Sequence, residues 1–268
     1  MTDLMNDINL DEDLKRKVTD LFRNEEAVVL SLARKCSKGK FSCLKNKSDL
    51  MRLAVILECA EKTRAFYNEK GISEKILADT LDDIRIWCEN NDNKGLANYN
   101  WIKNHINGEL FRIGRLQYQM FKCKSRTLRY SKLPFRYGEN VLYVHIPQGE
   151  KLVYSDCVRS LKDAVAFFDK YFPDFKYNFF FSESWLLYGE NWQFMEPSCN
   201  ILQFSALFDV AYSVNNESQA IERIFGRRQA EKENYPEKTT LQRNAKAFMQ
   251  GGGELGVGIG FIYKQSLL

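Results

Sequence analysis

The chain has 268 residues, 28% charged and 44% hydrophobic, and its 39 basic and 35 acidic side chains leave a net charge of +4. This composition excludes an intrinsically disordered chain, a collagen-like repeat and a coiled-coil rod, and it is typical of a folded globular protein. The length suits one large domain or two modest ones. No apolar run approaches the roughly 18 residues that a membrane helix needs, so the sequence predicts no membrane association.

The N-terminal fifteen residues are acidic and lack an apolar stretch, so we expect no signal peptide and a cytoplasmic protein. The seven cysteines are scattered and form no CxxC pair, which indicates buried apolar residues and not disulfides or a zinc site. The chain has two histidines, His105 and His145. No metal cofactor is therefore expected, and any catalytic imidazole must come from one of these two, with His105 read as a packing or surface residue.

Residues 1–110 have the apolar period of helices. Helices are predicted near 13–23, 49–67, 73–89 and 98–106. Ser73 is placed as an N-cap and Gly71 as the stop of the helix before it, because serine accepts from free backbone N–H groups and glycine adopts the left-handed conformation. This part of the chain is expected to form a helical N-terminal domain.

After Gly108 the apolar period changes toward two, which is typical of strands. Strands are predicted near 110–121, 140–146, 177–187, 200–214 and 255–263. Helices are predicted at 156–171 with Ser155 as its cap, and near 217–225 and 239–250. The fold class expected is α+β: helical residues 1–110, then residues 111–268 as a mixed sheet flanked by helices.

Polar side chains stand among aromatic ones near the ends of two predicted strands. Alternation directs His145 to one face of strand 140–146, just before Pro147 and Gly149 break the strand. Ser182 and Ser184 share one face of strand 177–187. His145 is the best candidate for a general base, because its ordinary pKa lies near neutrality, but a structural histidine and structural serines are the alternative.

The segment between Glu109 and Glu139 contains eight basic residues and no acidic one. They are Arg112, Arg115, Lys122, Lys124, Arg126, Arg129, Lys132 and Arg136. Such a segment is either a solvated sheet edge or a site for a polyphosphate ligand or nucleic acid. Nucleic acid is the least favoured of these, since no RRM, zinc or helix-turn-helix signature is present.

Glycine-rich stretches around Gly226 and 251–258 superficially resemble phosphate loops. Each follows a predicted helix, whereas a phosphate loop follows a strand and opens a helix. We therefore interpret Gly226 and Gly251 as helix C-caps. The alternating glycines at 256, 258 and 260 predict a close backbone approach to the last strand, or a bend in it.

Taken together, eight segments resemble a family of bacterial acyltransferases in order and spacing, over nearly the whole chain beyond about residue 40. The segments are 77–87 (LADTLDDIRIW), 96–101 (LANYNW), 108–117 (GELFRIGRLQ), 141–147 (VLYVHIP), 184–187 (SWLL), 198–201 (SCNI), 224–226 (IFG) and 240–243 (TLQR). That family joins a helical N-acyltransferase-type N-terminal domain to a GNAT-like C-terminal domain. The resemblance implies acyl-CoA or acetyl-CoA as cosubstrate, an amine acceptor, and two strands, 140–146 and 177–187, that diverge to admit the acyl-CoA.

The resemblance also implies roles for particular residues. His145 would remove the proton of the amine and Ser184 would protonate the thiolate or orient the carbonyl. The pyrophosphate of the cofactor would lie at Gln148, Gly149, Lys151 and Ser155, and the basic residues of 122–136 would be available to its phosphates. The expected residues around the substrate are Arg115, Gln117, Ser182 and Trp185.

A second hypothesis comes from a different class of protein. The chain can retain a GNAT-like fold and act as a non-catalytic ligand-binding or interaction module, because fold alone does not establish function. Release of a free thiol from an acyl-CoA distinguishes the two.

Overall fold

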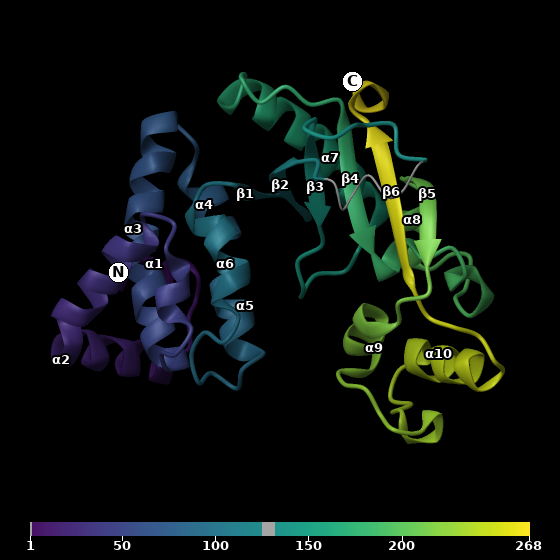
Figure 1. Ribbon diagram of the computed structural model, residues 1–268, viewed down its shortest axis with the longest axis horizontal. Helices are drawn as coiled ribbons and strands as arrows, with labels where there is room; N and C mark the ends of the chain where they lie inside the picture. The colour runs from purple at the N-terminus through teal and green to yellow at the C-terminus, as the bar shows by residue number, and fades with distance from the viewer. Residues whose placement is uncertain (1, 125–131) are drawn as a thin grey trace. The chain divides into compact units, whose positions relative to one another are not determined.

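The computed structural model describes residues 2–124 and 132–268. They form two compact units, Met1–Gln119 with Ile146–Glu150, and Met120–His145 with Lys151–Leu268. The strands of the described residues make one six-stranded sheet in the order β1-β2-β3-β4-β6-β5. The α+β fold class expected from the sequence, helices first and a mixed sheet with flanking helices second, is confirmed (Figure 1).

The first unit is built mainly of helices. Their bounds are α1 Thr2–Asp7, α2 Glu12–Cys36, α3 Asp49–Lys70, α4 Glu74–Leu81, α5 Asp83–Glu89 and α6 Tyr99–Ile106. Ser48 caps α3 by accepting from the Met51 N–H at 3.2 Å, and Gly71 ends it with a φ of 68°. Because α3 is apolar around most of its circumference, it forms the centre of this unit.

A buried polar cluster joins α5 to α6 within the first unit. The Asp83 carboxylate, 3% exposed, accepts a hydrogen bond from Trp101 Nε1 at 2.8 Å and lies 3.0 Å from Nε2 of the fully buried His105. Burial raises the pKa of Asp83, but the hydrogen bond and charge of His105, with the Trp101 hydrogen bond, outweigh burial and hold that pKa below its ordinary value. Asp83 is therefore a charged group in the core.

Replacing Asp83 by Ala should lower the free energy of unfolding by about 3–5 kcal/mol at neutral pH, because the imidazole and indole lose a buried charged partner. A depressed folded-state pKa adds stability above the unfolded value of about 3.9, and this stability is lost as pH falls through the folded value. The difference between parent and Asp83→Ala should therefore shrink toward about pH 3 in urea unfolding. Asp79→Ala, which removes a carboxylate paired with the exposed Lys75, is the control and should lower the free energy of unfolding by less than about 1 kcal/mol. Equal losses of unfolding free energy in the two variants at neutral pH would contradict this account.

The second unit holds most of the sheet. The strand bounds are β1 Leu110–Ile113, β2 Leu116–Lys122, β3 Asn140–His145, β4 Phe179–Ser184, β5 Asp209–Val214 and β6 Val257–Tyr263. The helices of this unit are α7 Tyr154–Tyr171, α8 Asn200–Ser205, α9 Ser218–Phe225 and α10 Thr240–Gln250. β3 pairs with β4 in parallel, whereas β6 pairs antiparallel with both β4 and β5.

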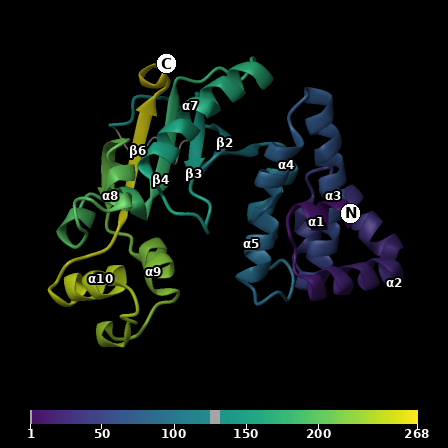
Figure 2. The same ribbon diagram turned by 180° about the vertical axis from the view of Figure 1, so that it is seen from behind.

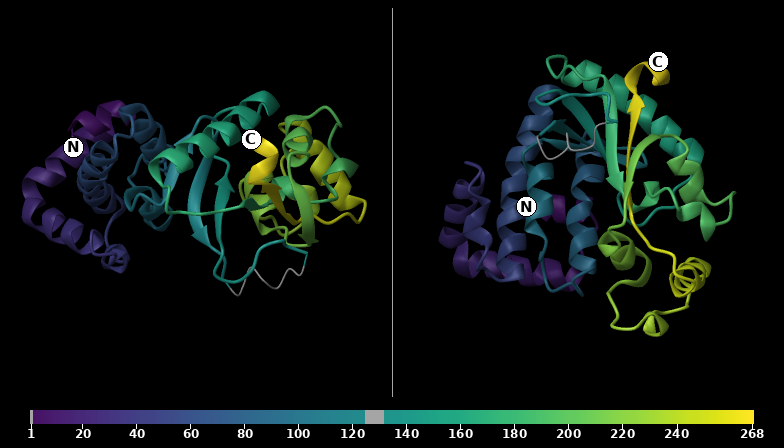
Figure 3. Two further views of the ribbon diagram at one scale, coloured as in Figure 1. Left: turned by 90° about the horizontal axis from the view of Figure 1, so that it is seen from above. Right: turned by 45° about the vertical axis from the view of Figure 1, so that its right-hand side comes forward.

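The two faces of this sheet are covered differently. α7 crosses one face (Figure 2), where Phe168 contacts Tyr177 and Tyr177 contacts Phe180, with ring centroids 6.2 and 5.7 Å apart. The other face carries a second apolar cluster that includes Phe135, Phe181 and Ile259. α9 and α10 lie near the residue where β6 begins (Figure 3). Together with Phe194, Tyr235 and Leu255 they form a separate apolar cluster.

Several predicted elements differ from those observed. The helix expected at 73–89 is two helices, α4 and α5, and the strand expected at 177–187 is β4 followed by the 3-10 helix Trp185–Leu187. The strand expected at 110–121 is a hairpin of β1 and β2, because Gly114 adopts a φ of 63° and reverses the chain. The strand expected at 200–214 is α8 followed by β5. The rings of Phe204, in α8, and Phe208, after it, lie 5.2 Å apart. Helix α7 begins at Tyr154 with Val153 as N-cap, not Ser155, because the Asp156 and Cys157 N–H groups both donate to the Val153 carbonyl.

Three glycines of the second unit have the roles expected from the sequence. Gly226 and Gly251 are the C-caps of α9 and α10. Within β6, a Cβ on Gly258 would overlap the backbone carbonyl of Leu187. The expected close approach to the last strand is thus present, and the element that approaches it is the 3-10 helix Trp185–Leu187.

Candidate active site

Strands β3 and β4 pair over a short stretch and then separate. Their register joins Leu142 to Phe180 and Tyr143 to Phe181, and within these described strands the pairing ends there. β4 continues beside β6 up to the pair Ser184 and Gly258. The carboxyl end of β3 therefore leaves β4 while β4 stays in the sheet, as Figure 1 shows.

A side chain replaces the backbone ladder where the strands separate. The Ser182 hydroxyl, which is fully buried, donates to the Val144 carbonyl at 3.0 Å. This hydrogen bond satisfies a carbonyl that the next rung of a parallel ladder would otherwise use. At this point of the sheet the Ser182 side chain, and not a backbone N–H, therefore links β4 to β3.

The register assigns the predicted catalytic side chains to opposite faces of the sheet. His145 shares a face with Tyr143, Phe181 and Glu183, because bridge partners point to the same side and side chains alternate. Ser184 lies on the other face with Ser182. Near the carboxyl ends of β3 and β4 the imidazole and the hydroxyl therefore point to opposite sides of the sheet.

His145 is partly exposed and is oriented by an aromatic neighbour. Its ring stacks on Tyr143 with centroids 4.2 Å apart and planes 28° apart, and Tyr143 in turn contacts the ring of Phe181 at 5.0 Å. Glu183 occupies the position on β4 that corresponds to His145 on β3. In the described part of the chain the Glu183 carboxylate has no hydrogen bond or ion pair. An imidazole and a carboxylate therefore occupy one face where the strands part.

Ser184 and Trp185 begin the turn that follows β4. The Ser184 hydroxyl accepts from the Leu186 N–H at 3.2 Å and caps the 3-10 helix, and Ser184 is 7% exposed. The backbone N–H of Trp185 donates to Gln219 Oε1 at 2.6 Å, and its half-buried side chain packs against the α9–α10 core. Ser184 thus keeps its own O–H donor while its lone pair holds the turn.

The loop after β3 is held by two buried arginines of the β1–β2 hairpin. Arg115 donates to the carbonyls of Pro147 and Glu150 at 3.1 and 2.8 Å. Arg112 pairs with the Glu150 carboxylate at 2.9 Å, which neutralises the acidic charge of the loop. We call residues Ile146–Glu150 the clamped loop. Arg115, expected near the substrate, is used here to position this loop.

The other predicted cofactor residues lie around the clamped loop and the start of α7. Gln148 exchanges hydrogen bonds with Asn90, and Gly149 has a φ of 111° with open space where a Cβ would stand. Lys151 and Ser155 are exposed, and Ser155 lies in the first turn of α7. No side chain caps that turn. Because the Asp156 and Cys157 N–H groups donate to the Val153 carbonyl, it is the Tyr154 and Ser155 N–H groups that have no acceptor among the described residues.

Replacing Arg115 by Met should raise KM for an acyl-CoA about tenfold and change kcat less. The substitution removes both donors that hold the clamped loop, and the uncharged side chain keeps much of the buried volume. Arg64→Met, which removes a guanidinium paired with the surface carboxylate of Asp7, is the matched control and should leave KM unchanged. Steady-state kinetics with an acyl-CoA donor measures both, and an unchanged KM in Arg115→Met would show that the clamp does not serve cofactor binding.

The basic segment of the sequence is not one continuous surface. Arg112 and Arg115 are 6% exposed and bound within the first unit. Exposed positions in the segment are Lys122, Lys124, Lys132 and Arg136. Arg126 and Arg129 lie outside the described residues. The cations that remain open to a phosphate are therefore fewer than the sequence suggested.

Two further residues change the site expected from the sequence. Gln117 is 1% exposed and its amide lies beside the Asp83 carboxylate in the first unit, away from solvent. Glu183 was not singled out, because only the parallel register of β3 and β4 places it on the face of His145. Among residues 2–124 and 132–268 no group of three or more His, Cys, Asp or Glu side chains is arranged to hold a metal ion, and no described helix is long and apolar enough to cross a membrane.

Comparison with known proteins bears on this architecture. Residues 1–108 match the model of an N-acyltransferase N-terminal domain, and residues 110–262 match that of a GNAT-like C-terminal domain. No curated protein sequence matches the chain. Two crystal structures of an acyltransferase have the same fold as this chain. One contains decanoyl-CoA and teicoplanin, and the other contains CoA and 10C-teicoplanin. Each gives a TM-score of 0.80 at 19% sequence identity, over 98% of this chain and 87% of that chain. A mutant acyltransferase with octanoyl-CoA gives a TM-score of 0.79.

The resemblance inferred from the sequence is confirmed over both parts of the chain. The diverging strands, the loop that follows β3 and the uncapped start of α7 all lie inside the GNAT-like match. With its helical residues in the other match, the chain belongs to the family that joins an N-acyltransferase N-terminal domain to a GNAT-like C-terminal domain.

Proposed function

We propose that the chain is an N-acyltransferase that moves an acyl group from an acyl-CoA to an amine. The observation that supports this most is the end of β3–β4 pairing after Tyr143 and Phe181, with an imidazole and a carboxylate on one face of the sheet and a hydroxyl on the other near the ends of the two strands. A thioester arm between the strands would meet these groups at the sheet edge. The structural neighbours that contain decanoyl-CoA or octanoyl-CoA suggest acyl groups of eight to ten carbons as the first donors to test.

In the proposed reaction the amine nitrogen attacks the thioester carbonyl carbon and the C–S bond breaks. His145, directly or through a water, takes the proton that the amine loses and so acts as the general base. Ser184 donates its free O–H to the departing thiolate or to the carbonyl oxygen. Glu183 is the second candidate for the base, or the group that orients His145.

For the cofactor we propose the start of α7 as the pyrophosphate site. Its first-turn N–H groups have no side-chain cap, and Lys151 adds a cation just before the helix. Gln148 and Gly149 belong to the first unit, so this proposal rests on α7 and Lys151 of the second unit alone. The exposed lysines 122, 124 and 132 are available for the outer phosphate.

For the substrate side we propose Ser182 and Trp185 as residues near the acyl group, since both lie where β4 leaves β3 and turns. Arg115 and Gln117 are not proposed to contact the substrate. Arg115 holds the clamped loop, and Gln117 is buried in the core of the first unit. We propose a cytoplasmic location, because the described cysteines are all free thiols, which suits a reducing compartment.

The experiment is to incubate the full chain with acetyl-, octanoyl- and decanoyl-CoA and a panel of small amines, following the melting temperature and release of free thiol. An enzyme should gain roughly 5 °C at a donor concentration about 100 times Kd, and should release one thiol for each amide formed. Binding without thiol release would favour the alternative, a non-catalytic module that retains the fold. Neither stabilisation nor release would contradict any acyl-CoA function.

A further inference from the structure

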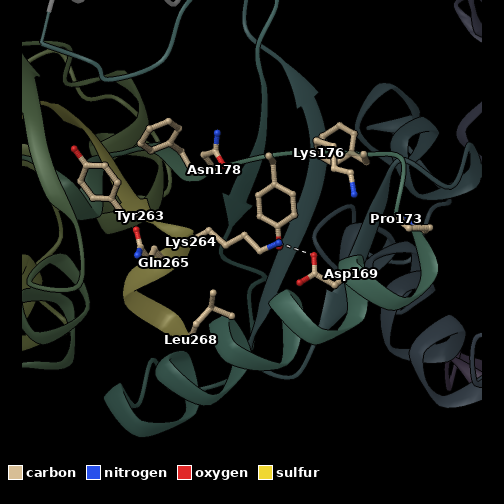
Figure 4. A pocket seen from close by; sticks show the side chains of 11 residues that line it. Asp169, Pro173, Lys176, Asn178, Tyr263, Lys264, Gln265 and Leu268 are labelled. Atoms are coloured by element: carbon tan, nitrogen blue, oxygen red, sulfur yellow. Dashed lines mark hydrogen bonds and ion pairs between the residues drawn. The ribbon is translucent and has the colours of Figure 1, made fainter.

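A pocket of about 670 Å³ lies in the second unit at the amino end of β4. Residues 175–179, the end of α7 at Asp169 and the segment after β6 line it (Figure 4). The volume is within the range of sites that hold drug-sized ligands. None of the residues proposed for acyl transfer is among those that line it.

The pocket lies at the opposite end of β4 from the proposed acyl-transfer site. Phe179, which lines the pocket, pairs with Tyr263, whereas Ser184 at the other end of the strand pairs with Gly258. Five residues of strand separate the two ends, a length of roughly 16 Å. A ligand in this pocket would therefore be distinct from an acyl-CoA held where β3 and β4 diverge.

One polar group in the pocket is buried and unused. The Tyr177 side chain is 5% exposed, and its hydroxyl has no hydrogen-bond partner among the described residues. Burial, and then the charge of Asp169, raise the pKa of Tyr177, so the phenol remains a neutral donor. A buried hydroxyl without a partner costs free energy, which an acceptor on a ligand would recover.

The charges around this hydroxyl favour an acid over an amine. Lys264 spans to Asp169 with an Nζ–Oδ1 distance of 2.5 Å, and its ammonium lies over the Tyr177 ring, 4.5 Å from the centroid (Figure 4). An internal cation thus already occupies the place that a ligand amine would take. Lys176 also lines the pocket, and no described residue forms an ion pair with it. Lys176 is therefore a cation of this pocket without an ion-pair partner among the described residues, beside the paired Lys264 and Asp169.

The walls of the pocket are aromatic. Four rings line it: Phe175, Tyr177, Phe179 and Tyr263. Phe175 and Tyr177 lie 6.0 Å apart and Phe179 and Tyr263 lie 5.2 Å apart, so each pair presents ring faces and edges at stacking distances. A flat ring fits such walls better than a branched aliphatic chain.

We propose that this pocket is a second binding site of the protein and that it takes a small aromatic carboxylate. The ligand's ring packs among the four aromatic side chains. Its carboxylate accepts a hydrogen bond from the Tyr177 hydroxyl and is balanced by the ammonium of Lys176.

Calorimetric titration of the full chain with 2-naphthoate tests the proposal, with 2-naphthylmethanol as the neutral probe of the same ring. One saturable site is expected for the acid, at least about tenfold tighter than for the alcohol. Tyr177→Phe, which removes only the hydroxyl, should weaken naphthoate about fivefold without lowering the melting temperature. Lys176→Met should weaken it similarly, whereas Lys170→Met, an exposed lysine of α7 outside the pocket, should not.

Saturating decanoyl-CoA should leave the naphthoate affinity unchanged, because the two sites are at opposite ends of β4. The proposal is overturned if naphthoate gives no saturable heat, if the alcohol binds as tightly as the acid, or if Tyr177→Phe and Lys176→Met both bind like the parent. Competition between naphthoate and decanoyl-CoA would also overturn it, since the acid would then occupy the acyl-transfer site.

Discussion

Replacing His145 by Ala is expected to lower kcat for acyl transfer by about 10²–10⁴-fold, the range that a positioned general base contributes. The imidazole is partly exposed at the end of β3, stacked on Tyr143, and lies where pairing with β4 has ceased. Its loss removes the proton acceptor and one ring contact of about 1 kcal/mol, so the variant should stay folded. Thiol release from decanoyl-CoA and the melting temperature measure the two effects separately.

The Glu183→Gln variant tests whether His145 or Glu183 is the general base. If His145 is the base and Glu183 orients it, Glu183→Gln should lower kcat modestly and shift the pH dependence of kcat. In His145→Ala the fall of kcat at acidic pH should be absent. Glu190→Gln, an exposed carboxylate in the turn after β4, is the matched control and should change neither. Full activity in His145→Ala with a large loss in Glu183→Gln would transfer the role of base to Glu183.

Replacing Gly258 by Ala is expected to lower the free energy of unfolding by more than about 3 kcal/mol, or to prevent folding of the second unit. A Cβ at this position would overlap the backbone carbonyl of Leu187, and a backbone atom cannot rotate away as a side chain can. To relieve the overlap, the 3-10 helix Trp185–Leu187 would have to lift from β6, together with the Ser184 cap.

Gly260→Ala provides the matched control two residues further along β6. A Cβ there would stand 3.0 Å from the Phe208 Cβ and 3.2 Å from the Leu187 Cδ1, so small side-chain shifts can accommodate it. We expect it to cost less than half as much in urea unfolding. Equal stability of Gly258→Ala and the parent would mean that the 3-10 helix does not rest on β6 as described.

The local elements of this chain could be predicted because their signals lie within a few residues of one another. Ser48 and Gly71 bound α3, and Thr239 caps α10 through a capping box. The segment 200–214 differs from its prediction because the apolar alternation from Leu202 to Phe208 runs past Ser205, where α8 ends, into the turn before β5. In such a segment the periodicity alone does not distinguish a strand from a helix, and the tertiary contacts of α8 determine which of them forms.

The candidate site was predictable only in part, for a similar reason. His145 and Ser184 stand at the ends of recognisable strands, so alternation alone could make them candidates. The role of Arg115 depends on contacts with carbonyls 32 and 35 residues away, and the pairing of Glu183 with the face of His145 depends on a parallel register. No local pattern encodes either contact, because crossover connections set the register between parallel strands.

Hydrogen–deuterium exchange of the full chain, with and without decanoyl-CoA, tests most directly whether the diverging strands receive the cofactor. Binding there should slow exchange in 142–145, 151–157 and 182–187, and leave 176–179 and 263–265 at the other end of β4 unchanged. Saturable binding without protection of those three segments, or with protection confined to the far end of β4, would contradict the assignment of β3, β4 and the start of α7 to acyl-CoA.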